Sequence, residues 1–174
     1  MRLARRKRRR ETVPGPSTAE RTLAELGPAL SADKSSIPAV LLVDPHAPSL
    51  VLCMEHIQSG LGGFDILVAR IPEVAIQTFE KNQDRITSVV ISQSMGQQHQ
   101  LRTAGNSVAQ EIRKIDKEVG IAMLCGTLHT PSDKSTVADA HEEKAIIGHQ
   151  DQFLKVVGDM ARLTEKRRPQ KLKH

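Results

Sequence analysis

Aromatic residues and cysteines are scarce in this chain. Tyr and Trp are absent, and only three Phe occur among 174 residues. Proteins that bind single-stranded nucleic acid stack the bases on aromatic side chains, so this composition argues against such a module. The two cysteines, Cys53 and Cys125, lie far apart and inside apolar runs. Because they show no disulfide spacing, we expect a reducing compartment.

Membrane and metal signals are also missing. No apolar run approaches the roughly 18 residues of a membrane-spanning helix, and Arg2 stands where myristoylation requires a glycine. The seven histidines are scattered without the short paired spacing of a zinc site. We therefore expect an intracellular protein with no transmembrane segment and with no metal or other cofactor in this chain.

Basic residues are concentrated at the two ends. The chain has a net charge of +5, but seven of its 25 basic residues lie in the first ten positions and five follow position 165. The remaining 13 basic residues face all 20 acidic ones, so the middle of the chain has a net charge of −7. We expect a cytoplasmic location, with nuclear import through the run Arg5–Arg10 as an alternative. The run Arg-Arg-Glu-Thr at residues 9–12 also has the form of a kinase site, in which Thr12 would be phosphorylated.

The chain divides into three parts by composition. Residues 1–36 combine the basic run with a Pro- and Ser-containing stretch and predict a disordered tail. Residues 37–165 alternate short β-type runs with helical periods, and residues 166–174 form a basic tail. This alternation predicts an α/β domain with a doubly wound, five-stranded parallel sheet of order 2-1-3-4-5. The expected strands are 39–44, 64–69, 86–92, 120–126 and 145–149, and the helix after the last strand is expected to be capped by Asp151.

Four residues are expected at the carboxyl edge of this sheet, where doubly wound folds bind their ligands. Asp44, Ser92 and Cys125 end the first, third and fourth apolar runs, and His149 ends the expected fifth strand. Cys125 could be a reactive thiol, but a buried, unreactive cysteine is the commoner case at such a position.

These residues resemble the pocket of receiver domains, the phosphate-accepting modules of response regulators. A receiver has an acid pair after strand one, an acceptor Asp on strand three, a Thr or Ser after strand four, and Lys-Pro after strand five. Here Asp44 is followed by Pro45, Ser92 replaces the acceptor, Cys125 replaces the hydroxyl, and His149 stands in the place of the lysine. The resemblance implies a receiver fold whose pocket has lost its chemistry. Ser92 cannot form an acyl phosphate, and one acid is too few for a magnesium site.

A narrower resemblance lies in residues 68–79, which include the run Ala-Arg-Ile-Pro-Glu-Val-Ala at 69–75. The stretch is similar to the receiver-like N-terminal region of the high-affinity cAMP-specific phosphodiesterases that consist of receiver, PAS and catalytic domains. It implies a regulatory module in cyclic-nucleotide signalling that contacts a neighbouring PAS or catalytic domain, or a protein partner. The chain contains no metal-phosphohydrolase motif, so hydrolase activity would belong to a longer relative and we do not expect this chain to be catalytic by itself.

Two other functions stay open from the sequence. One is a receiver protein of a phosphorelay, which needs an acceptor Asp that is not found at Ser92. The other is a nuclear or nucleic-acid-associated adaptor that uses the basic tails. The sequence does not indicate the oligomeric state or a small-molecule ligand.

Overall fold

The computed structural model describes residues 37–95, 104–126 and 137–168. Within them, five parallel strands form one sheet of order β2-β1-β3-β4-β5, which confirms the predicted topology. The expected disorder of residues 1–36 and the kinase site at Thr12 lie outside the described residues. The strands are β1 (Ala39–Val43), β2 (Asp65–Ala69), β3 (Ile86–Ser92), β4 (Gly120–Cys125) and β5 (Ala140–Glu143).

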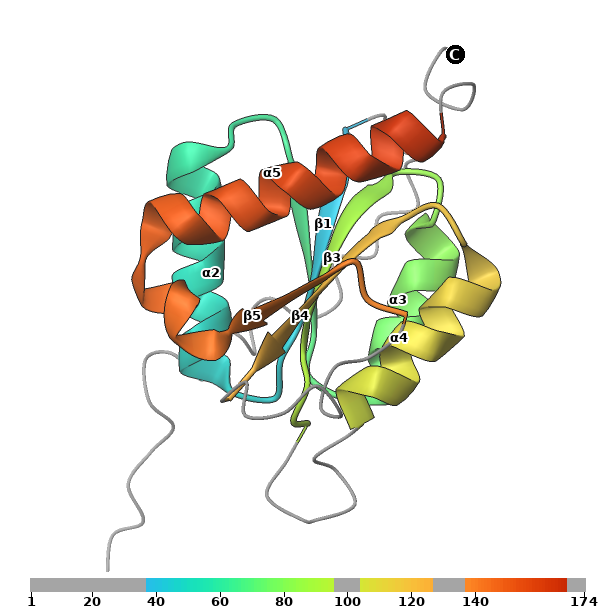
Figure 1. The fold of residues 1–174 in the computed structure, drawn as a ribbon, viewed down its shortest axis with the longest axis horizontal. Coiled ribbons are helices and arrows are strands. Elements are labelled where there is room, and N and C mark those ends of the chain that lie inside the picture. Colours follow the sequence, from blue (N-terminus) through green and yellow to red (C-terminus); the bar gives the residue numbers. More distant parts are fainter. Residues whose placement is uncertain (1–36, 96–103, 127–136, 169–174) are drawn as a thin grey trace, which may run out of the picture. The chain divides into compact units, whose positions relative to one another are not determined.

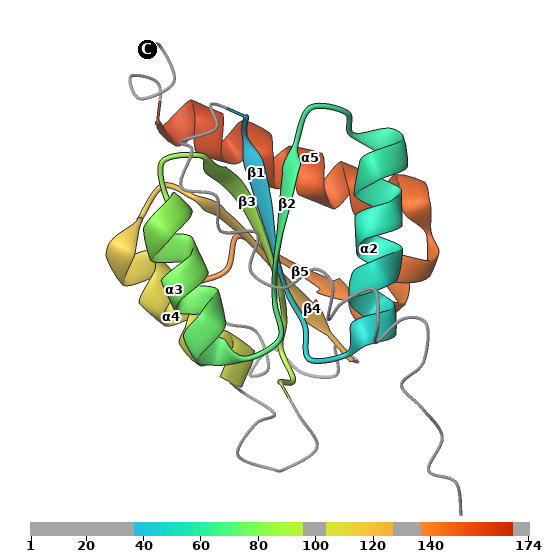
Figure 2. The same cartoon turned by 180° about the vertical axis from the view of Figure 1, so that it is seen from behind.

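Helices cover both faces of the sheet, as in a doubly wound fold (Figures 1 and 2). Helices α2 (Ala47–Gly60) and α5 (Gln150–Arg167) lie on one face, and α3 (Pro72–Asn82) and α4 (Ala104–Ile115) lie on the other. Pro lies in the first turn of both α2 and α3, where its missing N–H costs no helical hydrogen bond. At the other end of α2, Gly60 leaves room for the side chain of Leu154 on α5, whose Cδ1 would lie 2.1 Å from a Cβ there.

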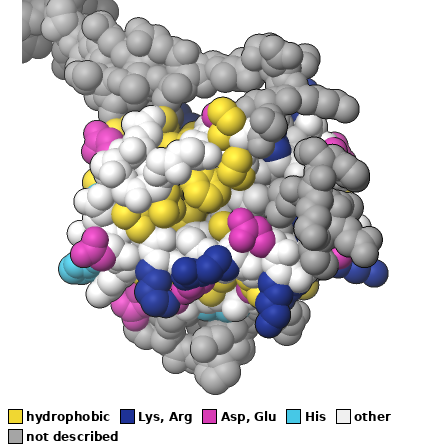
Figure 3. Space-filling view, turned by 90° about the horizontal axis from the view of Figure 1, so that it is seen from above, with side chains coloured by type: hydrophobic (Ala, Val, Ile, Leu, Met, Phe, Trp, Pro, Cys, Tyr) yellow, Lys and Arg dark blue, Asp and Glu magenta, His cyan; other side chains and the backbone are white. Residues whose placement is uncertain are grey.

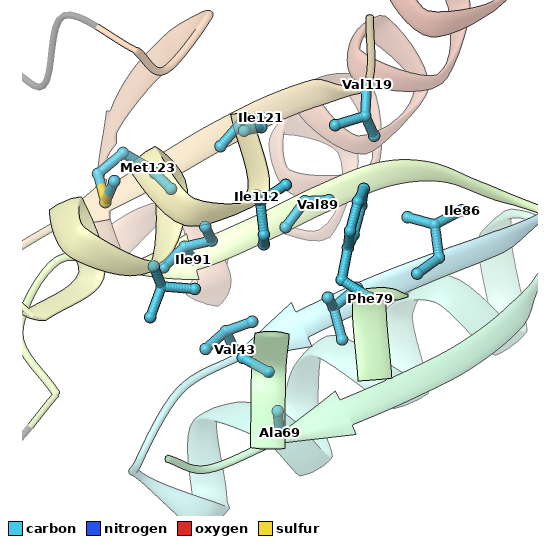
Figure 4. Close-up of a cluster of buried hydrophobic side chains, with 14 of the residues drawn as sticks. Val43, Ala69, Phe79, Ile86, Val89, Ile91, Ile112, Val119, Ile121 and Met123 are labelled. Atoms are coloured by element: carbon cyan, nitrogen blue, oxygen red, sulfur yellow. The ribbon is translucent and has the colours of Figure 1, made fainter. Parts of the chain in front are cut away.

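The core has one layer on each side of the sheet. Side chains of the central strands alternate between the two layers, and because both faces are covered these strands are mostly apolar. Figure 4 shows the layer under α3 and α4, where Phe79 and Ile112 lie against the strands. The opposite layer joins Val40, Leu42, Val90 and Ala122 to Phe153 and Val157 of α5.

The predicted fifth strand at 145–149 is wrong. Strand β5 is Ala140–Glu143, and Lys144–Gly148 forms the 3₁₀ helix η3. The physical reason is position, because β5 is an edge strand whose side chains are partly exposed and polar. The apolar residues Ile146 and Ile147 instead turn into the core layer that α2 and α5 cover.

The first turn of α5 also differs from the prediction. His149 precedes the helix as its N-cap residue, with no side-chain capping bond, and Asp151 lies exposed inside the first turn. An acid there still interacts favourably with the helix dipole. Asp151 therefore does not cap the helix.

The C-terminal boundary expected at residue 165 falls inside the folded domain. Helix α5 continues to Arg167, and Arg168 after it is only 3% exposed. The Arg168 guanidinium pairs with Asp116 and donates to the carbonyls of Gln83 and Ile86 at 3.3 and 3.1 Å. Lys166–Arg168 thus belong to the domain and not to a basic tail, because a buried ion pair holds the end of α5 in place.

A second cluster of arginines surrounds Asp139, the residue before β5. Arg113 and Arg167 each donate to one of its carboxylate oxygens, at 2.9 and 2.8 Å, and the N–H of Ile121 donates to it at 2.9 Å. Burial acts to raise the pKa of Asp139, but the hydrogen bonds from Arg167 and Ile121 and the charge of Arg113 outweigh it and lower that pKa. The cluster ties α4, α5 and the starts of β4 and β5 together.

The exposed side of α5 carries charges of both signs, with Asp159 paired to Lys155 and Arg162. Figure 3, a view onto the edge from which the strands start, shows hydrophobic side chains in one band, with Lys, Arg, Asp and Glu gathered beside it.

Among the described helices, none has the length and hydrophobicity that a membrane crossing requires.

Candidate functional site

The structure brings Asp44 and Ser92 together at the carboxyl edge of the sheet. Asp44 directly follows β1 and Ser92 ends β3, and these strands are parallel neighbours. Asp44 is 5% exposed and Ser92 is 2% exposed, so both are polar groups in an almost dry environment. Buried polar groups require partners, which makes their surroundings informative.

The main partner is Lys144, which the sequence reading missed. It follows β5 directly, and its Nζ lies 2.6 Å from Oδ2 of Asp44 in an ion pair. The same Nζ donates a hydrogen bond to the Ser92 hydroxyl at 3.4 Å. The chain therefore has a lysine after its fifth strand, and the expectation that His149 stands in that place is wrong. The error follows from the misplaced strand, because moving β5 five residues earlier puts Lys144 at its end.

Asp44 and Ser92 have further local hydrogen bonds. The other carboxylate oxygen of Asp44 accepts from the backbone N–H of His46 at 2.8 Å, which fixes the turn into α2. The hydroxyl of Ser92 donates to the carbonyl of Ser94 at 3.2 Å. One carboxylate oxygen of Asp44 is therefore paired with the Lys144 ammonium and the other with a backbone N–H. The site is a buried ion pair, and hydrogen bonds within the turns after β1 and β3 hold its two acceptor residues in place.

The first turn of α4 lies against the backbone of Ser92 and Gln93. The N–H of Gly105 donates to the carbonyl of Gln93 at 3.1 Å, and a Cβ at Gly105 would lie 2.2 Å from the carbonyl oxygen of Ser92. Only glycine permits this approach. Position 105 therefore has no room for a side chain beside the backbone of Ser92 and Gln93.

Cysteines lie close to the site but are buried. Cys125 ends β4, opposite Glu143 of β5 in the register, and belongs to the core layer under α3 and α4. Cys53 of α2 lies on the other side of the sheet, where burial and then the nearby charge of Asp44 raise the pKa of its thiol to about 12. Cys53 is therefore protonated at neutral pH and is no nucleophile.

His149 lies apart from Asp44 and Ser92. It lines a shallow pocket of about 290 Å³ on the outer side of β5 and η3 together with Glu142, Glu143, Ala145, Ile146 and Gln152. The four residues expected at one pocket are thus divided between an ion-pair site, a core layer and this surface. No group of three or more His, Cys, Asp or Glu suited to a metal ion occurs within the described parts of the chain.

A sequence signal for Lys144 does exist. Four polar or small residues, Ala140–Glu143, precede it, and the apolar run at 145–147 follows. An edge strand next to solvent carries this polar composition, whereas a buried strand would not. The acidic run was thus the strand, and the apolar run was the turn of helix after it.

Comparison with known proteins gives a fold. No family model matches the chain, and no curated protein matches its sequence. Among solved structures, a CheY-like receiver domain protein from Methanospirillum hungatei aligns with a TM-score of 0.62 and 13% identity, over 75% of this chain and 98% of that one.

Two further solved structures agree with this result. A response regulator receiver domain protein from Clostridium thermocellum has a TM-score of 0.58 and 17% identity, over 75% of this chain and 98% of its own. The chemotaxis protein CheY4 of Vibrio cholerae has a TM-score of 0.58 and 18% identity, over 71% and 98%. The chain therefore has the fold of the CheY-like receiver domains.

Proposed function

We propose that this chain is a receiver-like regulatory module that works through contacts with a partner and without phosphorylation of an aspartate. The observation that carries the proposal is the ion pair of Lys144 with Asp44, 2.6 Å apart, at a site where Ser92 replaces the acceptor. The lysine and one acid of a receiver are present, but the group that would take the phosphoryl is a serine.

The chemistry of the site supports this proposal. A serine hydroxyl cannot form an acyl phosphate, and Ser92 is also buried. Magnesium prefers about six oxygen ligands, whereas Asp44 offers one carboxylate that is already paired with a cation. A divalent ion that bound Asp44 would lie next to the Lys144 ammonium, and the repulsion between the two cations opposes its binding.

A receiver without this chemistry still has surfaces that can signal. We infer that partner contacts use the elements around β4, β5 and α5, and that binding stabilises one arrangement of them. This mechanism depends on packing, and it needs no cofactor in this chain.

The fold supports the phosphorelay hypothesis, because the similar solved structures include a CheY-like receiver domain protein and the chemotaxis protein CheY4. These likenesses favour a response-regulator-like role over the phosphodiesterase role. A phosphorelay function of this chain would require an acceptor other than Ser92.

A role as the regulatory part of a cAMP phosphodiesterase rests on the sequence resemblance alone. The run at 69–75 spans the end of β2 and the start of α3, where Arg70 donates to the carbonyl of Pro45 at 3.2 Å beside the site. Sequencing the natural transcript tests this role. Continuation into PAS and phosphohydrolase sequence supports it, and an open reading frame that ends at His174 contradicts it.

Labelling with acetyl phosphate and magnesium tests the main proposal. We expect intact-mass spectra of the wild type to show no added phosphoryl group. The variant S92D still lacks the second acid, whereas P45D/S92D supplies both acids and the acceptor around Lys144, and we expect labelling only in the double variant. An acid-stable label would indicate a hydroxyl, and a hydroxylamine-sensitive label on the wild type would overturn the proposal.

A further inference from the structure

We propose that the chain forms a two-fold symmetric dimer in which β2 pairs antiparallel with β2 of a second copy. The two five-stranded sheets would then form one continuous sheet. The proposal concerns the outer edge of β2, far from the question of phosphorylation, and it does not depend on the function proposed above.

The backbone of β2 has outward groups in a self-complementary pattern. The N–H of Asp65 donates to Pro38 and the carbonyl of Ala69 accepts from Asp44, so these two positions face β1. Because backbone direction alternates along a strand, Leu67 also faces β1, and the N–H and C=O groups of Ile66 and Val68 point away from it. No strand of the described residues pairs with that edge.

A two-fold axis at Leu67 satisfies these groups. It places Ile66 opposite Val68 of the second copy and Val68 opposite its Ile66, and each pair exchanges two hydrogen bonds. Leu67 then faces its own equivalent in a pair that is not hydrogen-bonded. An isologous contact of this kind closes at two copies.

The side chains of the two sheet edges differ in the way that such pairing requires. The β5 edge carries His141, Glu142 and Glu143, and charges on an edge strand block pairing. The centre of β2 is Ile66, Leu67 and Val68, with no charge and no proline. One edge is therefore protected against strand addition, and the other is not.

Charge complementarity favours a second copy as the occupant. Asp65 is the first residue of β2 and Arg70 follows its last, so an antiparallel arrangement brings Asp65 of each copy to the end of the strand where the second copy has Arg70. The Asp65 side chain pairs with Arg85 yet is 42% exposed, and the Arg70 side chain is also exposed. A partner strand with the same charge at both ends would not match this edge.

Exposed apolar side chains continue the surface from β2 into α3. Ile71 and Val74 are 52% and 40% exposed, and they are two of the three large hydrophobic side chains that the described residues leave exposed. Because α3 packs against α4 on one side, its other side faces the β2 edge. A two-fold axis perpendicular to the sheet places the two α3 helices on the same face, where these side chains become covered.

Sedimentation of the full chain over a range of concentrations tests the proposal. We expect a monomer–dimer equilibrium. In V68P the outward N–H is lost without disturbing the bonds to β1, and we expect dimerisation to weaken by about tenfold or more, because two hydrogen bonds of the dimer disappear. The matched control V68A keeps the N–H and should dimerise as the wild type does.

Cysteine cross-linking gives a readout that does not depend on V68P being folded. Facing residues of a pair that is not hydrogen-bonded have Cβ atoms about 5 Å apart, so L67C should form a disulfide-linked dimer under mild oxidation. K155C on α5 has a more exposed side chain and should cross-link far less. A chain that stays monomeric at several hundred micromolar, equal dimerisation of V68P and V68A, or equal cross-linking of L67C and K155C would each overturn the proposal.

Discussion

The edge of the sheet where the strands begin and the edge where they end hold their charged side chains in different arrangements. At the edge where the strands begin, three arginines hold two aspartates in two separate clusters: Arg113 and Arg167 pair with Asp139, and Arg168 pairs with Asp116. At the edge where the strands end, the described residues give Asp44 one cationic partner, Lys144. Ligands of doubly wound folds bind at the second edge. The comparison therefore indicates that the first edge maintains the fold, whereas the second holds a buried ion pair at the place where doubly wound folds bind their ligands.

The largest expected effect is at the first edge, on removal of Arg168. R168M keeps much of the buried stem but leaves Asp116 and two carbonyls without the guanidinium. Loss of one partner of a buried ion pair costs about 3–5 kcal/mol, and we expect the free energy of unfolding in urea to fall by that order. The control R162M removes an exposed arginine and should change it little. Equal effects of the two substitutions would contradict the distinction.

Asp139 should contribute less, and its contribution should depend on pH. D139N weakens the bonds from Arg113 and Arg167, and we expect a loss of about 2 kcal/mol near neutral pH. Because the folded pKa of Asp139 is lowered, its stabilisation is complete above the ordinary aspartate pKa of about 4 and disappears as the pH falls through the folded pKa. The difference between wild type and D139N in urea unfolding should therefore shrink in acid. A difference that is constant down to the most acidic condition would exclude this linkage.

At the second edge we expect a smaller cost. K144M leaves the buried Asp44 without its cation, but Lys144 is 28% exposed and the carboxylate keeps its bond from His46. We expect a loss of about 1–2 kcal/mol. The variant D44N/K144M should recover part of it, because it removes the uncompensated charge, and the double-mutant cycle measures the coupling. Additive effects of the two substitutions would show that no ion pair forms in solution.

The smallest effect is expected on the outer face of α5. Lys155 pairs with Asp159 at 2.8 Å, but its side chain is 74% exposed. Exposed pairs of this kind contribute about 0.5 kcal/mol or less, and salt screens them. K155A should therefore unfold almost as the wild type does in moderate salt. A loss comparable to that of D139N would place a stabilising network on this surface as well.

The topology could be predicted from the sequence because strand-like and helical periods alternate along the chain, and this alternation is typical of a doubly wound parallel sheet. Continuous apolar runs at β1, β3 and β4 are typical of strands covered on both faces, and they were read correctly. The edge strand β5 was misread because half of its surroundings is solvent, so its composition carries no apolar signal. The position of Asp44 and Ser92 at one edge followed from the order of the strands.

The partners of Asp44 and Asp116 could not be predicted in the same way. Lys144 lies 100 residues from Asp44 in the sequence, and Arg168 looked like part of a charged tail. Lysine and arginine are common on surfaces, so residue type alone does not distinguish an exposed cation from one that compensates a buried acid. That distinction requires the packing of elements that are distant in the chain.

Titration of the wild type with magnesium and beryllofluoride, a mimic of the acyl phosphate, tests the central claim most directly. Amide resonances of Asp44, Ser92 and Lys144 in ¹H–¹⁵N spectra report on the site. We expect them to stay unchanged in the wild type and to shift in P45D/S92D, because the ion pair of Lys144 and Asp44 leaves no anion and metal site unless the acids are restored. Saturable shifts of these resonances in the wild type would contradict the account and would indicate a functional acceptor.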